Sequence, residues 1–258
     1  MKSSSMNKNW VDVLGVKASA INYQSVLDRI FSWVKTGQKN YVCVAAVHLV
    51  MECQQDASLL AGVNRSGLVT PDGMPLVWLL KLADYQQTER VYGPDLMLKV
   101  CEQANRSGTT IFLLGGAEGQ SQLLKNKLTQ KFPDIKIVGH VDTPTRPLGT
   151  QENRQIIKKI NASSAQIIFV GLGCPHQERW MISNVPRLKN GVAIGVGAAF
   201  DFITGRVKQA PKWMRAIGLE WFFRLIQEPR RLAKRYLILN VSFVWKIAGK
   251  FTRSLLIK

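Results

Sequence analysis

The chain has 258 residues, and its 46% apolar fraction is ordinary for a globular protein, which excludes disordered and collagen-like classes. Its 35 lysines and arginines outnumber 17 acidic residues, so the formal net charge is +18. This excess indicates a polyanionic partner: nucleic acid, an anionic membrane surface or a phosphate-bearing substrate. The four cysteines form no CxxC pair, the N-terminal segment lacks the apolar core of a signal peptide, and no uncharged apolar run approaches the roughly 20 residues of a membrane span. We therefore expect a cytoplasmic protein with reduced thiols.

Short apolar runs alternate with amphipathic helical patterns along the first 205 residues. In chain order, the predicted strands are Val13–Val16, Tyr41–Ala46, Leu68–Thr70, Thr110–Leu114, Ile135–Gly139, Gln166–Val170 and Gly191–Gly195. The predicted helices are Tyr23–Val34, Leu49–Val63, Pro75–Leu82, Pro94–Arg106, Gly119–Phe132, Gln151–Ala162 and Pro175–Asn184. This alternation favours an α/β, Rossmann-like layered fold with a mostly parallel sheet, whose site lies at the carboxyl ends of the strands.

Residues 206–258 differ in composition, because they hold 13 basic and only two acidic residues, interleaved with aromatic ones. A helical pattern from Leu219 to Ile226 is broken by Pro229. A second helical stripe follows and comprises Leu232, Tyr236, Leu239 and Phe243. We interpret residues 1–205 as the catalytic domain and 206–258 as a helical appendage that docks on a membrane surface. There are two alternatives for residues 206–258: a helical pair that simply packs on the main domain, or a site for single-stranded nucleic acid.

Four predicted strand ends carry polar or glycine-rich motifs. Asp72 follows one strand, where an Asx turn is the structural alternative. Gly115 and Gly116 lead from a strand into a helix, where backbone amides can bind phosphate, although a tight turn needs the same glycines. The strands at 166–170 and 191–195 are followed by the candidates Gly171, Gly173, Gln177, Glu178 and Asp201. Gln177 can donate to and accept from a base or sugar, whereas the two acids could equally cap helices.

Several common nucleotide and metal motifs are missing from the sequence. There is no GxxxxGK[ST] segment, so a P-loop NTPase is excluded. There is no Asp-x-Asp pair, the usual metal clamp for a sugar nucleotide, and the three histidines match no metal-ligand spacing. We therefore expect no metal and no cofactor.

Taken together, the motifs resemble one family, the WecG/TagA/CpsF glycosyltransferases, also called glycosyltransferase family 26. The residues that carry the resemblance are Pro71-Asp72-Gly73-Met74-Pro75, Glu89-Arg90-Val91-Tyr92-Gly93, Leu114-Gly115-Gly116, Gly171 to Glu178, Gly195 to Phe202, Gly205, Ala210-Pro211, Gly218 to Leu225 and Glu228 to Arg231. The match runs from about Val13 to Leu237. Each piece is short, but their order and spacing make the combination specific.

The resemblance implies inverting, metal-independent transfer from a UDP-sugar to a polyprenyl-pyrophosphate-linked saccharide, in the synthesis of a bacterial surface polymer or exopolysaccharide. It implies Asp72 as the catalytic base and Arg90 as a pocket residue, and it places Gly171, Gly173, Gln177 and Asp201 beside the nucleotide sugar. Without a metal, arginines must stabilise the departing diphosphate. The candidates are Arg90, Arg224 and Arg231, with Arg230, Arg235 and His48 toward the acceptor and its phosphates.

One departure from the family pattern lies at the end of the second strand, where many members have Thr-x-Asn. Here Val44 and Ala46 stand in place of the polar residues, so a catalytically weakened or non-catalytic membrane-bound sugar-nucleotide binding protein is the alternative function. The donor would be a hexose or N-acetylhexosamine, and the long basic tail favours a hexose. We expect a peripheral protein on the cytoplasmic face of the bacterial inner membrane, with an anionic membrane surface and a lipid-linked acceptor as partners. Nucleic acid is not expected as a partner, and a homo-oligomer stays open.

Overall fold

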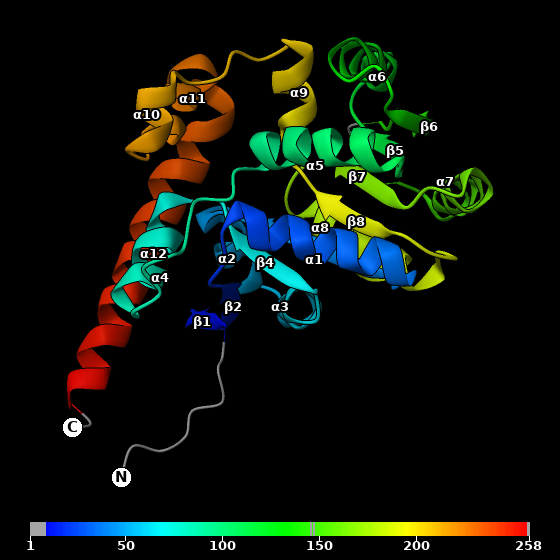
Figure 1. Cartoon of the computed structure of the whole chain (residues 1–258). Helices are drawn as coiled ribbons and strands as arrows, with labels where there is room; N and C mark the ends of the chain where they lie inside the picture. The colour runs from blue at the N-terminus through cyan, green and yellow to red at the C-terminus, as the bar shows by residue number, and fades with distance from the viewer. Residues whose placement is uncertain (1–8, 145, 147, 257–258) are drawn as a thin grey trace.

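The computed structural model describes residues 9–144, 146 and 148–256, apart from the side chains of residues 231, 234–237 and 251–256 (Figure 1). Its centre is a sheet of six strands that are all parallel: β3 (Asn40–Ala45), β4 (Leu68–Pro71), β5 (Thr110–Gly115), β6 (Lys136–Val141), β7 (Ile167–Gly171) and β8 (Val192–Gly195). The strand order is β4-β3-β8-β7-β5-β6. The predicted α/β fold is thus confirmed, although this order differs from the 3-2-1-4-5-6 of the dinucleotide-binding fold.

Helices cover both faces of the sheet, and each face has its own apolar core. One face carries α1 (Tyr23–Thr36), α5 (Gly93–Ser107), α6 (Gln120–Lys131) and α9 (Ala199–Thr204). The other carries α2 (Val47–Cys53), α3 (Ala57–Asn64), α4 (Met74–Leu82), α7 (Thr150–Ser163), α8 (His176–Asn184) and a short 3-10 turn, η1 (Val185–Arg187). Strands buried on both faces need the continuous apolar runs that the sequence shows. The four cysteines are free thiols.

Two sequence predictions were wrong in detail. The expected strand Val13–Val16 is a hairpin turn between β1 (Trp10–Val13) and β2 (Val16–Ser19), which pair antiparallel. Leu14 and Gly15 both have positive φ there, and the Gly15 N–H donates to Asp12 Oδ1 at 2.9 Å. The expected helix Leu49–Val63 is divided into α2 and α3, because the Asp56 carboxylate caps the second helix by accepting from the Ser58 and Leu59 amides.

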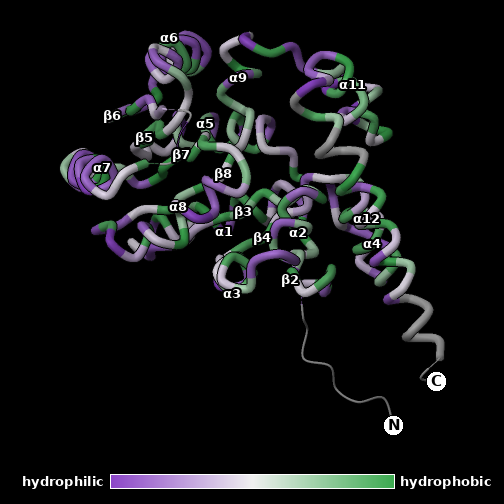
Figure 2. Tube along the Cα trace, turned by 180° about the vertical axis from the view of Figure 1, so that it is seen from behind, coloured by the Kyte–Doolittle hydropathy of each residue, from purple (hydrophilic) through white to green (hydrophobic). Residues whose placement is uncertain are grey.

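Three further helices follow the sheet: α10 (Lys212–Ala216), α11 (Glu220–Gln227) and α12 (Pro229–Leu256). The predicted break at Pro229 is confirmed, because α12 begins there, a position that needs no backbone N–H. Leu232 and Phe243 are buried, and Phe243 belongs to the same core as α2. Of the predicted stripe, the Tyr236 side chain lies outside the described residues. Figure 2 shows the helix at the edge of the molecule from behind. None of the helices, as far as they are described, has the length and apolarity needed to cross a bilayer.

Candidate active site at the carboxyl ends of the strands

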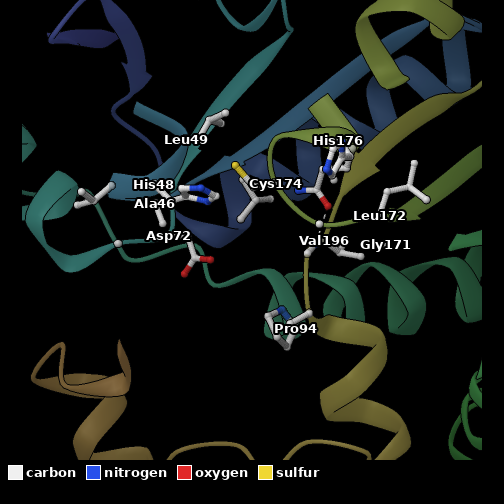
Figure 3. Close-up of a pocket in the computed structure, with 18 of the residues that line it drawn as sticks. Ala46, His48, Leu49, Asp72, Pro94, Gly171, Leu172, Cys174, His176 and Val196 are labelled. Atoms are coloured by element: carbon white, nitrogen blue, oxygen red, sulfur yellow. Dashed lines mark hydrogen bonds between the residues drawn. The ribbon is translucent and has the colours of Figure 1, made fainter. Parts of the chain in front are cut away.

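A cleft of about 1660 Å³ lies at the carboxyl ends of the parallel strands, where ligand sites of such sheets are expected. The strand order fixes the sequence of loops along it: Asp72 follows the edge strand β4, and Ala46 and His48 follow β3. The loops after β8, β7 and β5 come next. Figure 3 shows Ala46, His48 and Asp72 on one side and Gly171 and His176 on the other. The volume exceeds the roughly 300–1,000 Å³ of a pocket for one small ligand, so the cleft has room for a larger ligand or for more than one.

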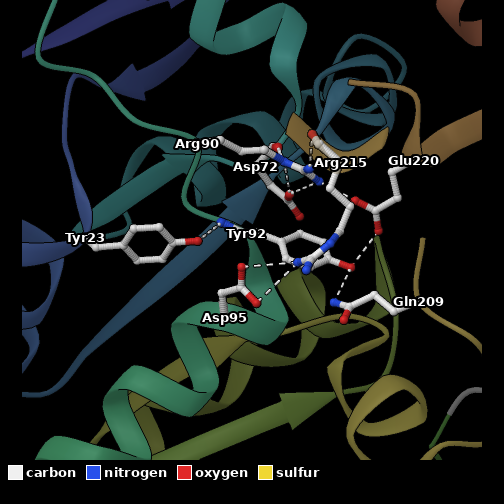
Figure 4. Close-up of polar contacts among 8 residues, drawn as sticks. All are labelled: Tyr23, Asp72, Arg90, Tyr92, Asp95, Gln209, Arg215 and Glu220. Carbon is white, nitrogen blue, oxygen red and sulfur yellow. Dashed lines mark hydrogen bonds and ion pairs between the residues drawn. The ribbon is translucent and has the colours of Figure 1, made fainter. Parts of the chain in front are cut away.

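Asp72 is fixed at the edge of the cleft by the neighbouring strand and by an arginine. Its backbone N–H donates to the Ala45 carbonyl at 2.8 Å, which continues the β3–β4 pairing by one residue. Arg90 Nη2 and Nε donate to the same carboxylate oxygen, Asp72 Oδ1, at 3.1 and 3.3 Å. Arg90 also donates to the Asp72 carbonyl. These contacts confine the carboxylate to one orientation, as Figure 4 shows.

The C-terminal helices join this pair through Glu220, the first residue of α11. Glu220 is buried, and its two oxygens accept from Arg90 Nη2 and from the Tyr92 hydroxyl, both at 2.6 Å. Arg90 Nη1 also donates to the Arg215 carbonyl at 3.1 Å. The guanidinium of Arg90 lies 4.5 Å from the centre of the Tyr92 ring. Arg90 therefore connects the carboxylate after β4 with the segment that covers it (Figure 4).

The environment shifts the pKa values of this cluster. The pKa of the Asp72 carboxyl is raised to about 6, mainly by burial; the charge of Arg90 opposes the rise, and the negative charge of Glu220 adds to it. The side chain is 20% exposed, so it meets the cleft. Burial lowers the pKa of Arg90, but the carboxylates of Asp72 and Glu220 more than offset this and hold it above its usual value. A carboxylate that titrates near neutrality next to a fixed cation is suited to accept a proton.

The glycine-rich loops line the opposite end of the cleft. Gly116, Gly171 and Gly173 all line it, as the sequence indicated. Gly115 lies beneath them: its φ is +122°, and a Cβ there would come within 2.5 Å of the Gly171 carbonyl oxygen. Gly115 therefore serves the close packing of β5 against β7, and Gly116 is the one that faces the cleft.

The polar residues of this end are largely engaged within the protein. Gln177 lines the cleft, but its Oε1 accepts from the Gly197 amide at 2.9 Å and its Nε2 donates to Glu178 Oε1 at 2.8 Å. Glu178 is fully buried and does not line the cleft. Asp201 lines it and accepts from Gln120 Nε2 at 2.8 Å. Gln177 thus holds the loop after β8 in place, and a contact between Gln177 and a ligand would come in addition to this structural role.

The predicted arginines are distributed unevenly. Arg224 lines the cleft, with its guanidinium 5.6 Å from the centre of the Phe202 ring, and its buried Nε has no hydrogen-bond partner among the described residues. Arg230 is exposed and lies outside the cleft lining, so the structure does not bring it to the site. The side chains of Arg231 and Arg235 lie outside the described residues. Among the described residues the cleft also has Arg206, whose Nη1 is 3.4 Å from Gln120 Oε1.

The floor of the cleft beside Asp72 is apolar where a polar pair was expected. Val44 and Ala46 both line it, so the departure seen in the sequence removes hydrogen-bonding groups from the cleft itself. His48 also lines the cleft, and its Nε2 is 3.1 Å from Glu52 Oε1 on the next turn of α2. Among the described residues, His, Cys, Asp and Glu form no cluster that could hold a metal ion.

Sequence reasoning missed Glu220, Tyr92, Gln120 and Arg206 as site residues. A signal for Glu220 existed: it is one of only two acids among the 13 basic residues of 206–258, and it opens a helix between apolar neighbours. Tyr92 lies two residues after Arg90, within the same short motif. Gln120 carried no local signal, because its contacts with Ala117, Asp201 and Arg206 join three separate loops.

A parallel α/β sheet with a carboxylate, arginines and glycine-rich loops at one edge defines a class of protein that binds phosphate-bearing ligands at its strand ends. Within that class, residues 11–255 match the model of the glycosyl transferase WecG/TagA/CpsF family, and the chain belongs to this family. A curated relative from Bacillus subtilis (strain 168), the N-acetylglucosaminyldiphosphoundecaprenol N-acetyl-beta-D-mannosaminyltransferase, is 33% identical over 170 residues. The matched part covers 66% of this chain and 64% of that relative.

Proposed function

We propose that this protein is an inverting, metal-independent glycosyltransferase that moves a sugar from a UDP-sugar to a polyprenyl-diphosphate-linked saccharide. The observation that carries the proposal is the pairing of Asp72 with Arg90 in a cleft with room for two substrates. Membership of the family supports it. The transfer requires a base for the acceptor hydroxyl and positive charge for the leaving diphosphate, and the cleft has both.

In the proposed step, the acceptor hydroxyl oxygen attacks the anomeric carbon of the donor sugar and its proton passes to Asp72. The bond from that carbon to the UDP oxygen breaks, and UDP leaves with the electron pair. Both contacts from Arg90 to the carboxylate go to Oδ1, so we assign the proton to Oδ2. A single displacement of this kind inverts the configuration at the anomeric carbon.

The leaving diphosphate is assigned to Arg224 and Arg206. Both line the cleft near Asp201, and the buried Nε of Arg224 has a free donor for a phosphate oxygen. A guanidinium can bind two phosphate oxygens at once, which allows an arginine to take the place of a metal ion in stabilising the charge. Gly116, Gly171 and Gly173 would let the nucleotide approach the backbone closely.

The relative supports the class of donor and acceptor. Its name describes the transfer of N-acetylmannosamine to N-acetylglucosaminyl-diphosphoundecaprenol, which favours an N-acetylhexosamine over the hexose that the tail suggested. The matched region covers 64% of the relative, so both substrates belong to this proposal. A lipid-linked acceptor also fits a protein that works at a membrane surface.

Docking on the cytoplasmic face of the bacterial inner membrane is part of the proposal. Exposed apolar side chains gather on the C-terminal helices: Trp213, Ile217, Trp221, Phe222, Ile226, Ile238, Val241 and Trp245. Basic residues of the same segment, such as Arg230 and Lys246, lie among them. Aromatic and basic side chains together suit the headgroup region of an anionic bilayer.

The test is to incubate the purified protein with a saccharide linked to polyprenyl diphosphate and a panel of UDP-sugars. The mass of the lipid product identifies the transferred sugar. We expect one N-acetylhexosamine or hexose to be added, with release of one UDP per product. Release of UDP without a lipid product would show hydrolysis and contradict the assigned acceptor.

A second candidate is a membrane-bound sugar-nucleotide binding protein without transferase activity. The observation that favours it is the apolar pair Val44 and Ala46 in the cleft, where many family members have polar residues. It predicts UDP-sugar binding by calorimetry with no product from any acceptor. The Val44→Thr, Ala46→Asn double variant sharpens the choice, because gain of transfer in the variant alone would support this second function.

A further inference from the structure

The cleft extends beyond Asp72 into an apolar arm, away from the glycine-rich loops. We use the name apolar arm for the part of the cleft lined by Trp78, Leu79 and Leu82 of α4 and by Leu239, Val244 and Ile247 of α12. Both helices lie on the same side of the sheet in Figure 1. Three of these side chains, Trp78, Leu82 and Val244, are largely exposed to solvent. Apolar surface that lines a cleft and stays accessible indicates a binding site for an apolar group.

The strand order decides which substrate can reach this arm. Asp72 follows β4 at one edge of the sheet, whereas Gly116 follows β5, which lies four strands away. At about 4.8 Å per strand, the two points are roughly 19 Å apart. A nucleotide bound over the glycines therefore reaches Asp72 from the side of the central strands. The other substrate must then approach Asp72 from the β4 edge of the sheet, where the apolar arm begins.

The arm also begins close to the reacting group, on the second turn of the helix that follows Asp72. Helix α4 starts at Met74, two residues after Asp72, and its nine residues rise by about 13 Å. Trp78 and Leu82 are four residues apart, so they share one face of the helix. A molecule whose hydroxyl meets Asp72 therefore has a continuous apolar surface beside it that leads out to solvent.

We infer that the apolar arm binds the first isoprene units of the acceptor's polyprenyl chain, next to its diphosphate. The inference rests on the proposed function, in which the acceptor is lipid-linked. An isoprenoid chain fits because each buried CH₂ contributes roughly 0.8 kcal/mol and the cleft lining from residue 239 to residue 248 of α12 is apolar apart from Asn240. The protein then recognises the acceptor at both ends, the hydroxyl at Asp72 and the chain between α4 and α12.

The test compares two valines on the same helix. Val244 is 63% exposed and lines the arm, whereas Val241 is 56% exposed and does not line the cleft. Either can be changed to serine on the surface of α12 with little cost in folding. The acceptors are one saccharide diphosphate with a tail of a single isoprene unit and the same compound with a tail of a few units, used without vesicles and below the concentration at which they form micelles.

We expect the wild-type KM to be lower for the longer tail. Val244→Ser should raise that KM roughly 5- to 30-fold, the effect of one to two kcal/mol, and raise the KM of the single-unit acceptor by a smaller factor, because a single unit covers less of the arm. Val241→Ser should change neither. Equal KM values for the two tails, or equal effects of the two variants, would overturn the inference.

Two controls separate this inference from the proposed function. If neither acceptor receives a sugar while UDP-sugar binding persists, the proposed transfer is wrong. The arm is then tested by binding alone: the longer acceptor should bind more weakly to Val244→Ser than to the wild type. A photoreactive group on the first isoprene unit should label peptides of α4 and α12. Labelling of another surface would show that the chain binds elsewhere. Full protection from labelling by a dispersed short-chain phosphatidylglycerol would show that the arm is a phospholipid site.

Discussion

The two walls of the cleft are built differently. In the wall from the sheet, polar side chains are engaged with one another: Gln177 holds the Gly197 amide, and Gln120 joins the Ala117 amide to Asp201. In the wall from the C-terminal helices, Arg224 has a buried Nε for which the described part of the chain provides no hydrogen-bond partner. The sheet wall is therefore shaped before a ligand arrives, whereas the helical wall offers unused charge. In the proposed function, the sheet wall would then set the geometry and the helical wall would supply charge to the diphosphate.

The two walls meet at Arg90, which bonds Asp72 from one wall and Glu220 from the other. A cation held between two carboxylates neutralises each of them only in part. Burial therefore keeps the pKa of the Asp72 carboxyl raised although Arg90 is its ion-pair partner, and the nearby charge of Glu220 adds to the rise. The variants below separate what each wall contributes, from the largest expected effect to the smallest.

Asp72→Asn tests the sheet wall at the proposed base. The amide keeps the shape of the side chain but takes no proton, so we expect the transfer rate to fall about 10²-fold or more. Binding of UDP-sugar, measured by calorimetry, should persist because the glycine-rich loops are untouched. Near wild-type transfer would end the assignment of Asp72 as the base.

Trp213→Ser and Trp245→Ser test the outer surface of the helical wall. Both side chains are exposed and lie outside the cleft lining. Removal of a large apolar side chain costs roughly 1.5–3 kcal/mol of burial, so each variant should bind anionic vesicles about tenfold or more weakly in co-sedimentation. The control is Leu123→Ser, an exposed apolar residue on α6. A loss of the same size there would contradict docking through the C-terminal helices.

Glu220→Gln tests the contact between the walls. The base acts in its unprotonated form, so the transfer rate should rise as the pH passes through about 6, the raised pKa of Asp72. Glu220 adds to that shift by its negative charge, and its removal should move the acidic limb of the rate profile to lower pH. An unchanged limb would show that Asp72 does not sense Glu220. The control Glu228→Gln, which also lies in the C-terminal segment, should leave the limb in place.

Treatment with EDTA tests whether the arginines stabilise the diphosphate without a metal ion, and it should have the smallest effect of these experiments. If Arg224 and Arg206 stabilise the diphosphate, the initial rate of UDP release should not change after treatment with the chelator. A rate that drops and recovers on addition of Mg²⁺ or Mn²⁺ would refute the metal-independent mechanism.

The sheet wall could be predicted well from the sequence, whereas the helical wall could be predicted only in part: Arg224 was expected and lines the cleft, but Glu220 was missed. Asp72 and Gly116 follow their strands directly and Gly173 lies two residues after β7, so a local pattern was enough to place them at one edge of the sheet. Glu220 lies 130 residues beyond Arg90, and no periodicity reports a contact of that range. Gln177 shows what a motif leaves out: it lines the cleft as expected, and its amide oxygen also accepts from the Gly197 backbone, a contact that the sequence did not reveal.

Two local patterns also misled the prediction of elements. The alternation at 13–16 suggested one strand, but Gly15 allows the positive φ of a hairpin turn there. The apolar run at 49–63 suggested one helix, but Asp56 accepts backbone hydrogen bonds and starts a new one. In both places a single residue with a backbone preference outweighed the periodicity around it.

The apolar floor formed by Val44 and Ala46 has a consequence for substrate fidelity. A wall that makes no hydrogen bonds discriminates between sugars by shape alone, and shape discrimination of one extra hydroxyl or methylene reaches only about 10²-fold. We therefore expect donors that differ by one small substituent to compete measurably in a mixed assay. In a cell, the choice of sugar would then depend on which activated sugar is abundant as well as on the protein.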